Sequence, residues 1–349
     1  MSLLITRNSK LKTMSSPTNI SESISQSPLP AFRLVEQHLY RIKKLIDEQM
    51  TGPPEAGDIN KLLQYVRCRS NEMIRPGLVL LAGKCCGKIT EEHVRVAAII
   101  EIIHNATLLH GDIIDRKPER LDESSINNLC NNETSVLLGD FLLGRVFQMC
   151  AAMEPRINEI ISSAAVRICE GQLRQIAQRK NWQLSESEYI DVITEKSATL
   201  FSTACRLGAL LAHGSDDQIK SLAEYGLNVG ISCQMADDLL DVINGRSSSE
   251  KTTNDNIGNH RLNLAVIHLL SVADEKTKQT VINLFSRNGT QKDKDVLLGM
   301  LRSQGSLEYA RSRAQDFVTE SIVALNSIQE GDAKEALVEM IKFIVSRTT

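Results

Sequence analysis

Apolar residues recur every three or four positions along most of this chain, the spacing that places side chains on one face of an α-helix. The pattern is visible from Phe32 onward and first breaks at Gly52-Pro53-Pro54. Further helices are predicted over about residues 58–70, 75–86, 91–116, 133–152, 156–180, 185–213, 216–245 and 259–273, with several more within 277–347. No alternating run is long enough for a β-strand. The chain is therefore predicted to be all-α.

Two of the predicted helices, those around residues 105 and 235, are apolar on most sides. Helices of this kind are buried, so both are expected at the centre of the molecule. With 349 residues, 42% of them hydrophobic, the chain can bury a large core. We expect residues 31–349 to form a single domain, an antiparallel helix bundle. Residues 1–30 are rich in Ser, Thr and Asn and are predicted to be a disordered tail.

The composition narrows the possible partners and compartments. A net charge of −3 gives no global reason to expect a nucleic-acid partner. The eight cysteines include no C-x-x-C pair, and most lie among apolar helical residues, which favours a reducing compartment such as the cytoplasm. The Ser-rich, acid-poor N-terminus leaves an organelle matrix open as the alternative, because transit peptides share that composition. No apolar run approaches the roughly 18 residues of a membrane-spanning helix.

The strongest chemical signal is a run of aspartates near the end of the helix predicted at 216–245. Asp237, Asp238 and Asp241 fall within about one turn, so their carboxylates repel one another unless a cation offsets the charge. Mg²⁺ suits such a site, because it accepts a few carboxylate oxygens and keeps its other positions for water and phosphate. An exposed acidic turn without a metal is the alternative interpretation.

A second set of aspartates lies upstream, at the end of another apolar helix. Asp112 and Asp115 are three residues apart and share a face. We call this pair the first cluster, and Asp237, Asp238 and Asp241 the second cluster. Two carboxylate turns on different helices can face each other across a bundle and hold several cations between them. A polyphosphate would then bridge these metals.

These segments together resemble the polyprenyl synthetase family, the all-helical trans-prenyltransferases that build linear isoprenoid diphosphates. The resemblance runs from about Phe32 to the C-terminus, and its motifs occur in the order of the family. They are Glu101 to His110 leading into the first cluster, Gly139 to Leu143, Lys196-Ser197-Ala198, Gln234 to Val242, and Gly305 to Ala310. The resemblance implies the isoprenoid synthase fold, helices around a deep central cavity with the carboxylates near its mouth. It also implies a homodimer.

The resemblance assigns a role to each matching residue. The two clusters would hold about three Mg²⁺ ions, which bind the diphosphate of an allylic substrate and help it leave. Isopentenyl diphosphate then attacks the allylic cation. The implied metal ligands are Asp112, Asp115, Asp237, Asp238 and Asp241. The implied allylic-diphosphate group is Lys196, Ser197 and Gln234, with Lys251 and Arg261 as further cations and Arg120 as the surviving allylic-side arginine. Arg75 and His104 would serve isopentenyl diphosphate.

Product length has a basis in the same resemblance. In the family, small residues just before the first motif leave the product tunnel open, whereas bulky aromatic residues close it. Ala106 and Thr107 occupy these positions here. An open tunnel and a long product are implied. Ala106 can serve equally as a residue that packs between helices.

Several positions depart from the family pattern. Gly111 stands where the first motif begins with an aspartate, so one metal ligand is missing. Glu72 replaces a phosphate-binding lysine, and Leu121 replaces an arginine, which weakens the isopentenyl diphosphate site. The allylic half of the site is therefore better preserved than the condensing half.

Three functions remain open from the sequence. The first is a Mg²⁺-dependent transferase that condenses an allylic diphosphate with isopentenyl diphosphate to give a linear all-trans polyprenyl diphosphate. The second is a catalytically impaired subunit that pairs with an active homologue in a heterodimer. The third is an enzyme that ionises an allylic diphosphate and no longer uses isopentenyl diphosphate. The sequence leaves the product length, the allylic starter and the partner undetermined.

Overall fold

The computed structural model describes residues 30–52, 72–114, 132–243, 261–286 and 290–346, together with residues 59–66 apart from 61 and 65. These residues form helices and short connections, and no strand occurs among them. The prediction of an all-α fold is confirmed. Of the predicted N-terminal tail, only Pro30 lies within the described residues, where it begins a short 3-10 turn.

Most helices begin and end within a few residues of the predicted bounds. The order is α1 (Glu36–Gln49), α3 (Ile74–Cys86), α4 (Glu91–Ile114), α6 (Asn132–Cys150), α7 (Pro155–Ala177), α8 (Glu186–Ile193), α9 (Thr199–Leu211), α10 (Asp216–Ile243), α11 (Leu264–Val272), α12 (Glu275–Phe285), α13 (Gln291–Ser303), α14 (Ser306–Ala324) and α15 (Asp332–Ser346).

Two boundaries differ from the prediction. The helix expected at 185–213 is divided into α8 and α9 by a π-helical turn, Thr194–Ala198. The helix expected from about 259 begins at Leu264, because the Asn263 side chain accepts a hydrogen bond from the backbone N–H of Val266 and caps α11. Both differences lie next to residues that were predicted to bind diphosphate.

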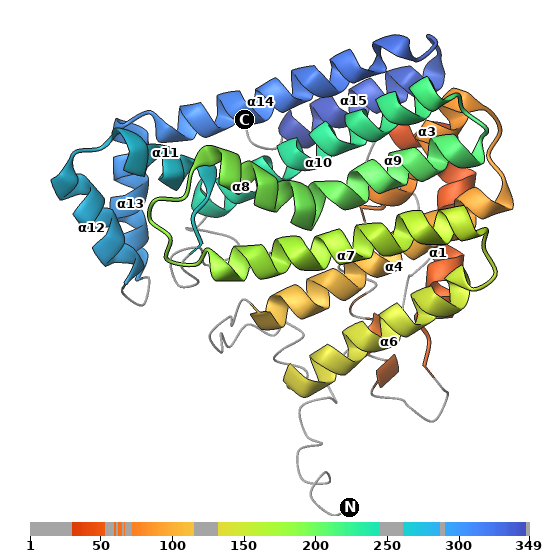
Figure 1. Cartoon of the computed structure of the whole chain (residues 1–349), viewed down its shortest axis with the longest axis horizontal. Coiled ribbons are helices and arrows are strands. Elements are labelled where there is room, and N and C mark those ends of the chain that lie inside the picture. The colour runs from red at the N-terminus through yellow and green to blue at the C-terminus, as the bar shows by residue number, and fades with distance from the viewer. Residues whose placement is uncertain are drawn as a thin grey trace, which may run out of the picture.

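The long helices run side by side through the molecule. Figure 1 shows α14, α10, α9 and α7 as neighbouring rods, with α4 and α6 below them and α11, α12 and α13 gathered at one end. The most extensive packing joins α10 to α9 and α14, α3 to α9, and α4 to α6. The arrangement agrees with the predicted helix bundle.

The helices α4 and α10 lie at the centre, as predicted. Apolar residues of α4 are buried all around the helix, including Val96, Ile99 and Ile102. By length and composition alone α4 resembles a membrane-spanning helix, which the sequence was not expected to contain, but 56% of its most apolar window is buried inside the bundle. Its hydrophobicity therefore reflects its place in the core.

Two apolar clusters form the core, and α10 contributes to both. Cys233 belongs to the cluster formed mainly with α1, α3, α4, α6, α7 and α9. Met235 and Leu239 belong to the cluster formed with α8 and α11 to α14. The aspartates of the second cluster interleave with these residues, so the packing of two cores fixes how the end of α10 is turned.

Candidate active site

The last turns of α10 divide their side chains between the core and the surface. Met235, Ala236 and Leu239 are buried, whereas Asp237 is exposed and Asp238 and Asp241 are partly buried. This division follows from helical geometry, because successive side chains point about 100° apart around the axis. The three carboxylates therefore differ in their surroundings although they are neighbours in the sequence.

Asp238 is held by two hydrogen bonds. The Tyr189 hydroxyl, from α8, donates to Oδ2 at 2.7 Å, and the Gln234 amide, one turn back on α10, donates to Oδ1 at 2.8 Å. Burial raises the pKa of Asp238, while these two donors and the charges of Lys196 and Arg261 act in the opposite direction. Burial and the Asp238 carboxylate together raise the pKa of Tyr189 well above its usual value, so its hydroxyl stays a donor.

The π-helical turn carries the predicted diphosphate lysine. The backbone N–H of Thr199 donates to the carbonyl of Thr194, five residues earlier, and the Thr199 hydroxyl donates to the same carbonyl at 2.9 Å. Lys196 and Ser197 lie within this turn. Such turns add one residue to a helix and recur at functional sites.

Both side chains of the turn find partners on neighbouring helices. The Ser197 hydroxyl donates to Oε1 of Gln234 at 2.6 Å, and the Lys196 ammonium donates to Oε1 of Gln175, on α7, at 2.9 Å. The predicted group of Lys196, Ser197 and Gln234 thus lies between the π-helical turn and α10, with Gln175 of α7 hydrogen-bonded to Lys196. Gln175 was not identified from the sequence.

Two glycines allow the turn to pack closely between α7 and α10. A Cβ added at Gly171, on α7, would lie 2.5 Å from the backbone N of Lys196. A Cβ added at Gly230, on α10, would lie 2.5 Å from Cα of Ala198. Heavy atoms do not approach this closely, so both positions need glycine. The π-helical turn therefore packs directly against the backbones of α7 and α10.

A small polar cavity lies where these groups meet. It holds about 30 Å³ and is lined by Gln175, Lys196, Gln234, Asp238, Arg261 and Asn263. Two predicted cations, Lys196 and Arg261, thus share one cavity with an aspartate of the second cluster. The cavity is large enough for a water molecule and too small for a diphosphate, which fits at most against its rim.

The first cluster is described only in part. Asp112 is partly buried in the last turn of α4, while Asp115, Arg120 and Lys251 lie outside the described residues. Just before it, His110 links α4 to α6, because its Nε2 lies 3.3 Å from the carbonyl oxygen of Val136 and 3.5 Å from Oδ1 of Asp140. The end of α4 is therefore anchored on α6.

Arg75, which was predicted to bind isopentenyl diphosphate, lies near an aromatic ring and under the influence of three acidic residues. The Arg75 guanidinium lies 4.3 Å from the ring centre of Phe201. Burial lowers the pKa of Arg75, and the charges of Glu101, Asp237 and Glu72 act in the opposite direction. Glu72 is therefore close enough to act on Arg75. Met73, between them, has a left-handed backbone with φ of 49°, a strained conformation for a non-glycine residue.

The predicted product-length residues lie deep in the bundle. Ala106 is buried on α4, and Thr107 is partly buried with its hydroxyl donating to the carbonyl of His104 at 2.7 Å. Neither residue lines the small polar cavity, the hollow beside α11 and α12, or the hollow between α10 and α14. The open-tunnel prediction therefore stays a prediction.

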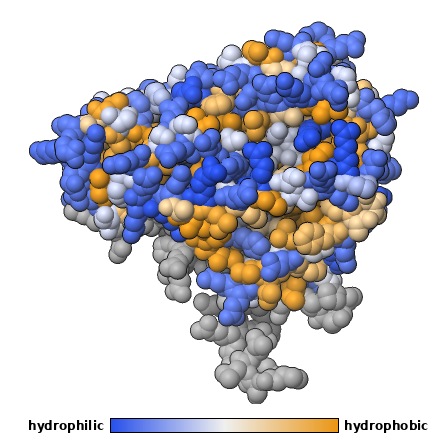
Figure 2. Space-filling view, viewed as in Figure 1, coloured by the Kyte–Doolittle hydropathy of each residue, from blue (hydrophilic) through white to orange (hydrophobic). Residues whose placement is uncertain are grey.

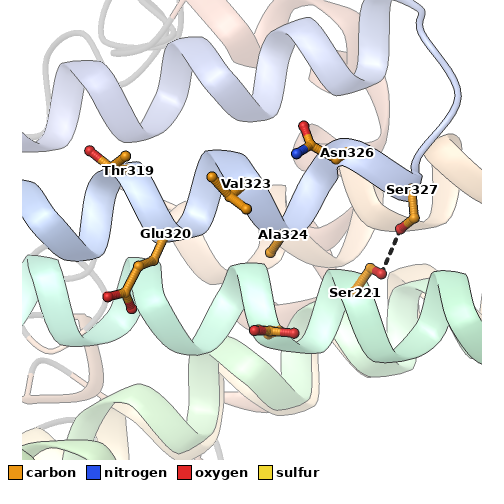
Figure 3. Close-up of a pocket in the computed structure, with 8 residues that line it drawn as sticks. Ser221, Thr319, Glu320, Val323, Ala324, Asn326 and Ser327 are labelled. Atoms are coloured by element: carbon orange, nitrogen blue, oxygen red, sulfur yellow. Dashed lines mark hydrogen bonds between the residues drawn. The ribbon is translucent and has the colours of Figure 1, made fainter.

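The two larger hollows lie away from the aspartates. One, of about 660 Å³, is lined by Trp182 of the connection between α7 and α8 and by residues of α8, α11, α12 and α14, including Tyr309. The other, of about 490 Å³, lies between α10 and α14, where Ser221 and Ser327 are hydrogen-bonded at 2.6 Å (Figure 3). Glu224 and Glu320 line it and would repel a diphosphate. Neither hollow is lined by an aspartate of the two clusters.

The described donors suit Mg²⁺. Asp112, Asp237 and Asp241 offer carboxylate oxygens, the ligands this ion prefers, and all three are at least partly accessible. Among the described residues, no three His, Cys, Asp or Glu side chains lie together as a complete metal site. A metal site that takes carboxylates from both clusters is consistent with this separation of the described carboxylates.

Comparison with known proteins agrees with these features. The polyprenyl synthetase family model matches residues 57–299. An octaprenyl diphosphate synthase from Escherichia coli is 30% identical over 90% of this chain and 97% of its own. Heptaprenyl diphosphate synthase component 2 from Bacillus subtilis is 28% identical over 78% of each chain. A polyprenyl synthase structure from Caulobacter crescentus, complexed with calcium and isoprenyl diphosphate, superposes with a TM-score of 0.84 at 27% identity, covering 91% of this chain and 97% of that one. The chain belongs to the polyprenyl synthetase family.

Proposed function

We propose that this protein is a Mg²⁺-dependent prenyltransferase that condenses an allylic diphosphate with isopentenyl diphosphate to give a linear all-trans polyprenyl diphosphate. The observation that carries the proposal is that Lys196, Gln234 and Arg261 line one polar cavity together with Asp238 of the second cluster, while Ser197 donates a hydrogen bond to Gln234. The relatives support it, because they are named as synthases of such products. Mg²⁺ is the metal that the family uses.

The residues of this chain divide the work between binding and ionisation. Asp237 and Asp241 of α10 and Asp112 of α4 would hold the metal. When bound, Mg²⁺ would neutralise the diphosphate and make it a better leaving group. Lys196 and Arg261 add positive charge where the leaving oxygen becomes more negative, which stabilises the transition state more than the bound substrate. Ser197 and Gln234 fix the turn that carries Lys196.

The condensation conserves atoms and electrons. The carbon–oxygen bond of the allylic diphosphate breaks, and its electron pair stays on the diphosphate. The double bond of isopentenyl diphosphate supplies the electrons of the new carbon–carbon bond, and a proton is then lost. Arg75 and His104 would hold the diphosphate of isopentenyl diphosphate, with Glu72 opposing it.

The family relationship favours a working synthase over the two alternatives from the sequence. The relatives found by comparison include long-chain and short-chain prenyl diphosphate synthases, and the isopentenyl diphosphate side retains Arg75 and His104. About three Mg²⁺ ions, shared between the clusters, form part of the proposal. The named component 2 relative supports a heteromeric enzyme as a further form of the same activity.

Exposed apolar side chains on α6 and α4 support a dimer. On α6, Leu137 and Phe147 are 66% and 72% exposed, and Leu108 on α4 is 36% exposed. Figure 2 shows apolar residues gathered on the lower part of this face. Large exposed apolar side chains on one helix mark an interaction surface, and two-fold association is the commonest way to cover it. We therefore propose a dimer through α6.

The test is a product assay. Purified protein is incubated with Mg²⁺, farnesyl diphosphate and labelled isopentenyl diphosphate, and the products are measured by mass spectrometry with the Asp237→Asn variant as the inactive control. Elongated diphosphates from the wild type alone would support the proposal, and their length would test the role of Ala106. Recovery of starting material only, while an active homologue elongates under the same conditions, would contradict it. Diphosphate release without elongation would support the ionising alternative.

A further inference from the structure

Tyr189 lies outside both aspartate clusters yet contacts one of their members. It is the fourth residue of α8, its side chain is 4% exposed, and its hydroxyl donates to Oδ2 of Asp238 at 2.7 Å. The remaining oxygen, Oδ1, accepts from Gln234. Both oxygens of Asp238 are thus used by donors within the protein.

The hydrogen bonds of Asp238 add to the apolar packing that fixes how this end of α10 is turned, and with it the direction of the neighbouring side chains. Asp237 is adjacent on the same helix and exposed, and Asp241 is three residues further along. Because side chains on a helix keep fixed angles to one another, holding Asp238 toward the core holds Asp237 toward solvent. The hydrogen bonds that hold Asp238 therefore help to keep Asp237 where it can reach a metal.

The Tyr189 ring is itself firmly placed. A capping box between Ser185 and Glu188 fixes the start of α8. The ring then packs in the same apolar cluster as Met235 and Leu239, which flank the aspartates on α10. The hydroxyl therefore reaches Asp238 from a rigid support.

Tyr189 also closes a chain of hydrogen bonds around the site. From Tyr189 the chain runs to Asp238 at 2.7 Å, to Gln234 at 2.8 Å and to Ser197 at 2.6 Å. Ser197 lies eight residues after Tyr189 on the same continuous stretch of helix. Tyr189 thus connects α8 to α10 before the π-helical turn in the chain, and Ser197 connects the turn itself to α10.

We propose that Tyr189 is a positioning residue for the second aspartate cluster, acting through Asp238 to orient Asp237 and Asp241 toward the metal and the diphosphate. This inference rests on the proposed function. A purely structural role would need only the ring, because the ring supplies the packing. The hydroxyl supplies the orientation, and the two contributions can be separated by Tyr189→Phe.

The chain offers a matched control on α10. Tyr225 is fully buried, and its hydroxyl donates to the carbonyl of Leu337 at 2.8 Å. Tyr225 lies twelve residues before Asp237, which corresponds to about 18 Å along a helix. Tyr225→Phe therefore removes a comparable buried hydrogen bond from the same helix without touching the site.

The experiment measures binding of inorganic diphosphate to the full-length protein by calorimetry as Mg²⁺ is varied, with thermal melting of each variant. Tyr189→Phe is expected to weaken Mg²⁺-dependent diphosphate binding by about 10- to 100-fold, the usual effect of removing a group that orients a metal ligand. Tyr225→Phe is expected to bind as the wild type does. In a double-mutant cycle, Tyr189→Phe is expected to add little to the loss caused by Asp238→Asn, because both act through one carboxylate.

The outcomes separate this inference from the function on which it rests. Wild-type binding by Tyr189→Phe would overturn the inference and leave the proposed function intact. Equal losses in Tyr189→Phe and Tyr225→Phe, in step with their melting temperatures, would overturn it as well, because they indicate general destabilisation. No Mg²⁺-dependent binding by the wild type would overturn the proposed function and this inference together.

Discussion

The second cluster lies among side chains that hydrogen-bond to one another, whereas Asp112, the described member of the first cluster, lies in the last turn of α4, which His110 joins to α6. Asp238 accepts two hydrogen bonds from side chains of the protein, and the turn that carries Lys196 packs closely between α7 and α10. Around Gly111, beside Asp112, an added Cβ would meet no atom within 4 Å. The side chains around the second cluster are therefore held in place by one another, on the side of the site that the proposed function assigns to the allylic diphosphate.

Preorganisation of one half has a chemical consequence. Electrostatic catalysis is strongest where charges and dipoles need not rearrange when the reaction occurs. Ionisation of the allylic diphosphate requires such charges at the leaving group, and the proposed function assigns this role to Lys196 and Arg261, which line one polar cavity. We therefore expect substitutions on the α10 side to cost more than substitutions on the α4 and α3 sides.

The largest effect is expected from Asp237→Asn. This carboxylate is exposed and directed away from the core, and the amide that replaces it has no charge to offer a cation. The rate should fall on the order of 10²- to 10³-fold, as when one electrostatic contact is removed from a transition state. Initial rates at saturating substrate measure it, with the exposed, site-distant Asp217→Asn as the control. A loss below threefold would mean that Asp237 does not bind the metal.

A smaller but still large effect is expected from Gly230→Ala. The new Cβ would meet Cα of Ala198 at 2.5 Å, so the backbone of the π-helical turn must shift and move Lys196 with it. A displacement of about 1 Å at a reacting group can cost about 10²-fold in rate. The matched control is Gly299→Ala, on α13, where an added Cβ meets nothing within 4 Å. Equal activity of the two variants would show that the turn tolerates the shift.

The sequence could predict the central helices and the site residues that match the family pattern. The helices α4 and α10 were predicted because their apolar residues repeat at helical spacing, and both are central in the structure. The resemblance to the family singled out Lys196, Gln234, Asp238 and Arg261, which line one cavity, and Ser197, which donates to Gln234. Each of these residues matches a position of the family pattern, so the resemblance could identify it from the sequence.

The residues that hold the site residues in place could not be identified from the sequence. Tyr189 and Gln175 act across helices, and neither lies in a motif that marks its partner. The π-helical turn was predicted as ordinary helix, because one extra residue per turn depends on packing against Gly171 and Gly230 rather than on local propensity. Contacts between distant segments set these features, so a pattern along the chain cannot show them.

On the α3 side, Glu72→Lys is expected to improve the protein. Glu72 is close enough to influence Arg75, and a negative charge there opposes the diphosphate of isopentenyl diphosphate. A lysine would replace repulsion with one charged contact worth about 1.5–3 kcal/mol. The KM for isopentenyl diphosphate should fall by about tenfold, and further with Leu121→Arg, although Leu121 lies outside the described residues. Glu72→Gln separates loss of repulsion from gain of contact, and an unchanged KM in all variants would place isopentenyl diphosphate elsewhere.

The smallest effect is expected from Gly111→Asp, which tests whether the first cluster is weak because a carboxylate is missing. The site has room for the side chain, since an added Cβ meets nothing within 4 Å. The gain in Mg²⁺ affinity should be about fivefold, near 1 kcal/mol, because repulsion from Asp112 and exposure to solvent offset part of the new contact. The concentration of Mg²⁺ that gives half the maximal rate measures this gain.

Gly111→Ala is the control for Gly111→Asp, because replacing a helical glycine stabilises the helix by about 0.5–1 kcal/mol without adding a ligand. If the aspartate and alanine variants need the same Mg²⁺ concentration, position 111 does not face the metal and the first cluster works with Asp112 and Asp115 alone. If only the aspartate variant needs less Mg²⁺, the difference between the two sides lies in a missing ligand on α4. The organised α10 side would then be what allows the enzyme to function without it.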